Sequence, residues 1–236
     1  MILAEMGKKK RRNVPLLKSL TFYLTKHRNM LDIKQISDCL FALKQLSYKD
    51  QATLERLCAQ LEGLVKDTAS SPVLRSVLIS LGQLKYLHAP VVDRIMDWHQ
   101  ARLDKSIPMA TKDMTTLLMT CATLNHNPLH HSSLLDHMSQ SLSLDLGQPE
   151  QVWLDTVWSI TILGRATPHH LQSVLTPAFH TSLLCKYHHL PHTIASPILS
   201  PCRSHNQHIY PSNSQAAQYQ CCSQVTLPRL SRYDHS

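Results

Sequence analysis

A dense run of positive charge near the start of the chain could bind a phosphate backbone. Its members have a cationic side chain, or an aromatic ring between cationic neighbours: Lys8, Lys9, Lys10, Arg11, Arg12, Lys18, Tyr23, Lys26 and Arg28. Lysines and arginines that neutralise phosphates release bound counterions, and an outward-facing tyrosine can stack on an unpaired base. These nine residues are therefore our candidate RNA-binding site, and the ring of His27 could also stack if it faces outward.

The same residues also allow a structural interpretation. The run from Lys8 to Arg12 could be a solvated loop between helices or a nuclear localisation signal, and Tyr23 could pack against the next helix. The distribution of charge nevertheless favours an anionic partner. Residues 1–49 carry 11 Lys or Arg and 3 acids, whereas residues 50–166 carry 9 and 12. The basic surface is thus local, as an anionic partner near that end would need.

Residues of catalytic and metal-binding types occur elsewhere without a spacing that identifies a site. Three acids at helical spacing have arginines among them and indicate a solvated charged face: Asp93, Asp97 and Asp104. Three histidines surround a turn at residues 127–128 and are interpreted as turn residues: His126, His130 and His131. The five glycines are isolated, so no phosphate-binding loop occurs. We expect no enzyme activity, no catalytic or metal-binding residues and no cofactor.

Residues 177–236 are rich in histidine, proline and serine and contain further metal-ligand types. Cysteine and histidine recur there at short intervals: Cys185, His188, His189, His192, Cys202, His205 and His208. No Cys-x-x-Cys pair is present, and these spacings match no common zinc module. No acid occurs between Asp155 and Asp234, and helical periodicity is lost. We therefore predict a disordered tail of low order rather than a metal site.

Four similar leucine-rich segments form the framework that positions these residues. They end at Leu46, Leu84, Leu124 and Leu163, which lie 38, 40 and 39 residues apart, and a second helix-like segment follows each. Self-similarity at this period is typical of a solenoid of stacked helical hairpins. We predict an all-α protein with about four units of 38–40 residues over residues 1–176, beginning inside a repeat.

Local signals place several helix starts within this framework. Capping residues or prolines suited to the first helical turn occur at Pro15, Asp32 with Gln35, Asp50, Ser71-Pro72 and Thr167-Pro168. In the fourth unit, Trp153 and Trp158 are five residues apart and so lie on different sides of a helix. We expect both to be core residues, one of them partly exposed.

Composition agrees with a helical protein that has a sizeable core. The 236 residues are 43% apolar and include only 5 glycines. The cysteines number seven, and Cys39, Cys58 and Cys121 fall at apolar helix positions, which indicates buried free thiols in a reducing compartment. No apolar run approaches the roughly 18–20 residues of a membrane span. We see no secretory signal, and the basic run after Glu5 makes a poor mitochondrial presequence.

Three segments resemble the helical-repeat region of the FAST kinase domain-containing proteins: residues 6–17, residues 40–49 and residues 155–159. The likeness covers roughly residues 1–175. It implies a mitochondrial RNA-binding protein, because members of that family influence the stability and processing of mitochondrial transcripts. It also implies FAST modules and a RAP domain after this region, where the helical pattern of this chain ends.

A protein-interaction scaffold without direct RNA contact is the alternative hypothesis. Solenoids often present a concave face to a protein partner. The concentration of positive charge within residues 1–49 favours RNA. Against RNA, no pair of polar positions recurs in register across all four units, as a code of one base per repeat would require.

Overall fold

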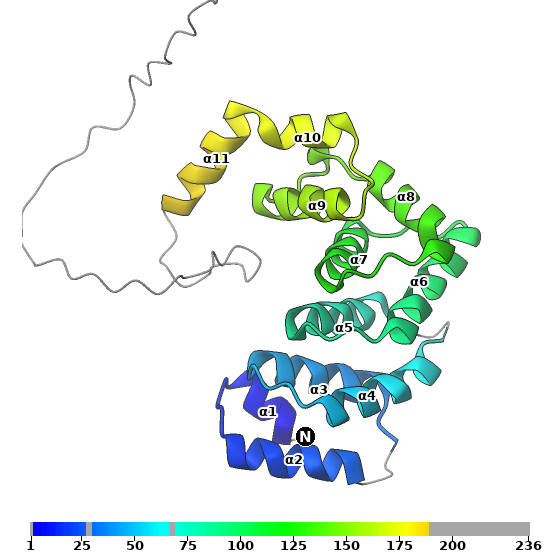
Figure 1. Ribbon diagram of the computed structural model, residues 1–236, viewed down its shortest axis with the longest axis vertical. Coiled ribbons are helices and arrows are strands. Elements are labelled where there is room, and N and C mark those ends of the chain that lie inside the picture. Colours follow the sequence, from blue (N-terminus) through cyan, green and yellow to red (C-terminus); the bar gives the residue numbers. More distant parts are fainter. Residues whose placement is uncertain (1, 27–29, 67–68, 189–236) are drawn as a thin grey trace, which may run out of the picture. The chain divides into compact units, whose positions relative to one another are not determined.

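The structure is a computed structural model that describes residues 2–26, 30–66 and 69–188, and within these ranges the chain forms α-helices and short 3₁₀ turns without any strand (Figure 1). Five helices pack in succession as a first stack: α1 (Ile2–Lys8), α3 (Ile33–Gln45), α5 (Ser71–Leu84), α7 (Thr111–Leu124) and α9 (Glu150–Ile162). None of the described helices is long and apolar enough to cross a membrane.

Each first-stack helix is followed by a second helix of the same unit. These are α2 (Val14–Lys26), α4 (Gln51–Leu64), α6 (Ala89–Asp104), α8 (Ser132–Ser141) and α10 (Pro168–Leu175). Of these, α2 packs on α4 and α4 on α6. Two 3₁₀ turns, η1 (Leu129–His131) and η2 (Leu144–Leu146), flank α8. The prediction of an all-α protein built from helical-hairpin repeats is confirmed.

All five first-stack helices end in the same backbone motif. One or two positions after the last residue of each helix, a residue has a left-handed conformation, with φ between 46° and 72°: Lys10, Ser47, Lys85, Asn125 and Gly164. The N–H of the next residue then donates to a carbonyl five residues earlier, at 2.8–3.1 Å. This motif satisfies carbonyls that the helix leaves unpaired and reverses the chain toward the second helix.

This helix ending accounts for the repeat seen in the sequence. The left-handed residues lie 37, 38, 40 and 39 positions apart. The leucines that mark the sequence period, Leu46, Leu84, Leu124 and Leu163, stand immediately before the last four of them. The first member, Lys10, has no such leucine, so α1 extends the same stack by one more helix than the leucines indicate.

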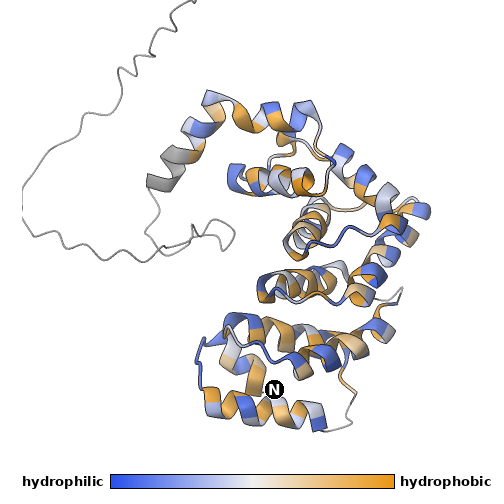
Figure 2. Cartoon of the chain, in the orientation of Figure 1, coloured by the Kyte–Doolittle hydropathy of each residue, from blue (hydrophilic) through white to orange (hydrophobic). Residues whose placement is uncertain are grey.

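The core consists of one apolar stripe from each helix. Figure 2 shows hydrophobic residues recurring along the helices of the hairpins. In α3, for example, Ile36, Leu40 and Leu43 are fully buried. Each such side chain stabilises the fold by about 1.5–3 kcal/mol relative to an exposed one. The first-stack helices therefore hold together mainly through these stripes.

The three expected buried thiols are confirmed. Cys39, Cys58 and Cys121 form no disulfide and are buried within the helical core. Burial raises the pKa of each thiol to about 12, because a thiolate is costly to desolvate. All three therefore stay protonated near neutral pH and act as packing residues rather than nucleophiles.

The two tryptophans of α9 differ in exposure, as their spacing predicts. Trp153 is fully buried, and its indole N–H donates to Ser173 Oγ of α10 at 2.9 Å. Trp158, five residues later, is 43% exposed. Trp153 thus ties α9 to its second helix, while Trp158 lies at the edge of the core.

Helix caps form at most of the expected positions. Asp32 and Gln35 make the predicted capping box, with bonds of 2.7 Å and 3.1 Å, and Asp50 accepts from the backbone N–H of Thr53 at 3.0 Å. Thr167 makes a second capping box with His170. The expectation that Ser71 caps its helix is wrong: the cap position is Ser70, and Ser71 lies in the first turn of α5.

Helical structure extends past residue 176, where the predicted repeat region ends. Helix α11 (Pro177–His188) follows α10 after Thr176 and packs against α9 and α10. Phe179 is buried there, and Ser182 Oγ donates to Glu150 Oε1 at 3.1 Å. Pro177 sits at a first helical position, where a missing N–H costs nothing, so this proline starts a helix. Residues 189–236 of the predicted tail lie outside the described residues.

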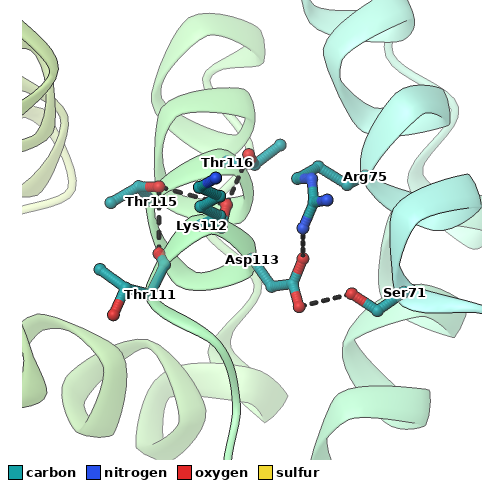
Figure 3. Close-up of polar contacts among 7 residues, drawn as sticks. All are labelled: Ser71, Arg75, Thr111, Lys112, Asp113, Thr115 and Thr116. Atoms are coloured by element: carbon teal, nitrogen blue, oxygen red, sulfur yellow. Dashed lines mark hydrogen bonds and ion pairs between the residues drawn. The ribbon is translucent and has the colours of Figure 1, made fainter. Parts of the chain in front are cut away.

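A buried carboxylate joins α7 to α5 of the preceding unit (Figure 3). Asp113 of α7 is 6% exposed and accepts from Arg75 Nη1 and Ser71 Oγ of α5, each at 2.5 Å. The charged guanidinium of Arg75 and the hydroxyl of Ser71 compensate the desolvation of the carboxylate, which would otherwise be costly in this position. Ser71 therefore connects two units instead of capping its own helix.

Substituting Gly7 by alanine should weaken the packing of α1. An added Cβ would lie 2.6 Å from the Cα and 2.7 Å from the Cβ of Ala42 in α3, and backbone atoms cannot move aside cheaply. We expect Gly7→Ala to lower the free energy of unfolding by about 1–3 kcal/mol. Gly63→Ala in α4 is the matched control: its Cβ would meet nothing within 4 Å, so it should stabilise by about 0.5–1 kcal/mol. Urea denaturation followed by circular dichroism measures both, and equal effects would contradict the predicted clash.

Removing the arginine from the link between α5 and α7 should also destabilise the protein. Arg75→Ala leaves the buried carboxylate of Asp113 with Ser71 as its remaining side-chain donor. Because Arg75 is partly exposed, we expect a loss of about 1–3 kcal/mol in the free energy of unfolding. Glu5→Gln, which removes an exposed pair with Lys8, should change it by less than about 1 kcal/mol in the same assay. A loss for Arg75→Ala no larger than that control would refute a stabilising role for the link.

Candidate nucleic-acid interface

The predicted basic run forms the end of α1 and the connection to α2, which is coloured hydrophilic in Figure 2. Lys8 is the last residue of α1, and Lys10 takes the left-handed conformation that reverses the chain. The side chains of Lys9, Lys10 and Arg11 are all exposed. Positive charge is favourable at a helix C-terminus, where the backbone dipole is negative. Three cations are therefore presented to solvent by a defined turn.

Two other members of the run have partners within the protein. Lys8 Nζ lies 3.3 Å from Glu5 Oε1, but both side chains are more than half exposed, so this pair contributes little stability. Arg12 Nε donates to the backbone carbonyl of Leu46 at 3.0 Å, at the end of α3. Arg12 therefore helps to hold the first turn against α3, although its residue, like Lys8, is exposed.

A similar contact between a cationic side chain and the end of a neighbouring helix occurs one unit later. Lys49 follows α3 as Arg12 follows α1, and its Nζ donates to the carbonyl of Lys85 at 2.9 Å, at the end of α5. In both cases a cation meets carbonyls at the negative end of the neighbouring helix. Positive charge in residues 1–49 thus has two roles: some cations bind helix ends, and others remain at the surface.

An exposed face of α2 continues the basic surface. Lys18 and Lys26 are exposed and flank Phe22 at intervals of four residues, which places them along one side of the helix. Phe22 and Tyr23 are 57% and 58% exposed, and their rings meet edge to face with centroids 6.1 Å apart. Lys26 Nζ lies 5.7 Å from the centroid of the Phe22 ring. Aromatic rings set among cations are what a single-stranded nucleic acid can stack on.

Sequence reasoning included Tyr23 in the site but missed Phe22. The residue Tyr23 is largely exposed, as the stacking interpretation requires. The spacing Lys18, Phe22, Lys26 was a usable signal, since it places an aromatic ring between two cations on one helix face. Arg28 of the predicted set, like His27, lies outside the described residues.

Away from this surface, the fold gathers the histidines of residues 126–131 beside the acids of α6. His126 Nε2 is 2.7 Å from Asp93 Oδ1, and His130 Nε2 is 3.8 Å from Asp93 Oδ2. His131 Nε2 lies 3.5 Å from Asp97 Oδ1. The sequence interpretation treated these groups as separate turn and surface residues, because 29 or more positions separate the acids from His126 in the chain. Packing of the turn after α7 against α6 brings them together.

Comparison with known proteins finds similarity in one family. Residues 114–184 match the model of the FAST kinase-like protein, subdomain 1. This match spans parts of α7 to α11, so the segment similar to the first FAST subdomain overlaps the helical repeats. The expectation that the FAST modules follow the helical-repeat region is thus corrected for this subdomain.

Full-length relatives match over most of the chain. FAST kinase domain-containing protein 4 of Homo sapiens is 26% identical over 184 residues, which are 78% of this chain and 28% of that protein. The same protein of Rattus norvegicus is 25% identical over 78% of this chain and 29% of its own length. That of Mus musculus is 24% identical over the same shares. The chain thus spans less than a third of the length of these relatives. The comparisons confirm that it resembles the FAST kinase domain-containing family, with FAST kinase domain-containing protein 4 among its relatives.

Proposed function

We propose that this chain binds RNA through the turn after α1 and the exposed face of α2. The observation that carries the proposal is the continuity of exposed cations with exposed aromatic rings over α1 and α2. Lys9, Lys10 and Arg11 lead directly into the helix that presents Phe22 and Tyr23. Cations bind the phosphate backbone and rings stack on bases, so the surface supplies both interactions that single-stranded RNA requires.

The resemblance to the FAST kinase domain-containing family supplies the biological setting of this proposal. It suggests a mitochondrial protein that acts on the stability and processing of mitochondrial transcripts, and so a transcript as the RNA partner. Cations and stacked rings distinguish poorly between RNA sequences, because every base offers an aromatic face. We therefore infer broad binding to single-stranded RNA by this region, with sequence preference supplied elsewhere.

The scaffold hypothesis has one observation in its favour. A mostly apolar recess of about 340 Å³ lies between the end of α6, the start of α7 and α8. Its lining includes Leu103, Ile107, Met109 and Met114. An apolar side chain of a protein partner could enter such a recess. RNA remains the proposal that accounts for the concentrated charge.

Neutralising the exposed cations of the turn should weaken RNA binding and its salt dependence. We expect Lys9→Gln, Lys10→Asn and Arg11→Gln together to lower affinity for labelled single-stranded RNA at least about tenfold at low salt. The slope of log affinity against log salt should fall by about 2, at roughly 0.7 per phosphate contact. Asparagine is chosen at position 10 because it tolerates the left-handed conformation. Fluorescence anisotropy of the full chain at several salt concentrations measures both quantities.

A charge-matched triple variant tests whether position matters. Lys66, Arg94 and Lys112 are exposed and lie outside the proposed interface, so changing all three to glutamine removes the same charge. This control should retain most of the affinity and the salt slope. Equal losses in the two triple variants would indicate non-specific attraction to net charge. Undiminished binding by the first triple variant would contradict the interface.

Removing the exposed ring of Phe22 separates stacking from charge. Phe22→Ala should weaken binding by about 1–3 kcal/mol per stacked base while the salt slope stays unchanged. Leu16→Ala is a control in the same helix, since Leu16 is also exposed but carries no ring. Circular dichroism of both variants checks that the helices persist. Equal effects on affinity would argue against stacking at Phe22.

A further inference from the structure

We propose that Asp93, His130 and His131 form a binding site for a transition-metal ion, with Zn²⁺ as the ion best suited to it. One carboxylate oxygen and one ring nitrogen from each histidine all lie within 4.8 Å of one another. Imidazole nitrogens with a carboxylate oxygen are a frequent ligand set for catalytic and surface-accessible zinc. The proposal is independent of RNA binding and rests on a different part of the fold.

The histidines come from a 3₁₀ turn that faces the second helix of the preceding unit. In η1, the rings of His130 and His131 lie side by side with centroids 4.2 Å apart. Asp93 and Asp97 are four residues apart on α6 and so share one face of that helix. A bound ion would therefore join α6 to η1, the 3₁₀ turn that precedes α8 in the next unit.

The three ligand atoms lie within 4.8 Å of one another and must move closer together to bind one ion. His130 Nε2 lies 3.8 Å from Asp93 Oδ2. Two ligands of one tetrahedral zinc ion, each about 2.0–2.1 Å from the metal, stand roughly 3.3 Å apart. The side chain of His130 is 62% exposed and can rotate into place without disturbing the core. Asp97 or a water molecule completes the coordination at the fourth position.

His131 supplies the independent observation that points to a ligand. His131 is only 5% exposed. Its buried Nε2 atom has no hydrogen-bond partner among the described residues. The carboxylate of Asp97 lies 3.5 Å from that atom without forming a hydrogen bond to it. A buried polar atom of this kind is costly unless something satisfies it, and a metal ion would do so.

A neighbouring histidine holds the carboxylate in the orientation the ion requires. His126 Nε2 contacts Asp93 Oδ1 at 2.7 Å, which leaves Oδ2 directed toward His130. The backbone N–H of His126 donates to Cys121 O in the motif that ends α7. Hydrogen bonds from outside the ligand set commonly fix a metal-binding carboxylate in this way. The repeating helix end thus prepares one side of the site.

Zinc-dependent thermal stability of the full chain, stripped of metal with a chelator, tests the proposal. An ion that binds the folded helices but not the unfolded chain should raise the Tm by about 5–10 °C at roughly a hundredfold excess over Kd. We expect ZnCl₂ to do so in the original protein and not in Asp93→Asn or His130→Ala. His137→Ala, which removes an exposed histidine of α8 outside the cluster, should keep the shift.

The outcomes distinguish this site from the other histidines of the chain. Zinc held by ligands within residues 189–236 would leave the same shift in all three variants, which would overturn the proposal. No shift in the original protein would overturn it as well. Loss of the shift in Asp93→Asn and His130→Ala, with unchanged Tm values before zinc is added, would support it.

Discussion

The left-handed residue that ends each first-stack helix is the constraint on which the rest of the structure depends. It occurs at Lys10, Ser47, Lys85, Asn125 and Gly164, and four of these five residues carry a side chain. A non-glycine residue in this conformation costs roughly 1 kcal/mol, so packing and hydrogen bonds must offset it. The packing comes from an apolar stripe buried on both helices of the hairpin, and the hydrogen bond is the one that ends the first helix. Regular reversal of the chain is what allows one hairpin to stack on the next.

Neighbouring units are joined by charge as well as by apolar packing. Arg12 and Lys49 each donate to a carbonyl at the end of the next first-stack helix, and Arg75 pairs with the buried Asp113. A cation at a helix C-terminus meets partial negative charge and unpaired carbonyls, so one side chain satisfies both. The number of lysines and arginines in a segment therefore does not by itself show how many of them bind a ligand. Lys9, Lys10, Arg11 and Arg12 are all exposed, but Arg12 also donates a hydrogen bond to the end of α3.

Both proposed sites use segments that follow a first-stack helix. The basic turn follows α1, and the histidine cluster begins with His126, directly after the left-handed Asn125 of α7. Segments that connect helices on a rigid repeat are free to vary in sequence, because they contribute little to the core. The same scaffold can thus present cations and rings at one unit and metal-ligand side chains at another.

Sequence patterns alone were enough to predict the helical hairpins up to residue 176, their period, the buried cysteines and the basic run. These follow from local rules: apolar residues at helical spacing, capping residues such as Asp32 and leucines before each reversal. The folded structure was needed to show that Arg12 and Ser71 bind residues of the neighbouring unit and that a helix follows Thr176. It was also needed to show that Asp93 meets His130, because contacts between residues 37 positions apart depend on how hairpins stack. Local periodicity contains no information about such distances.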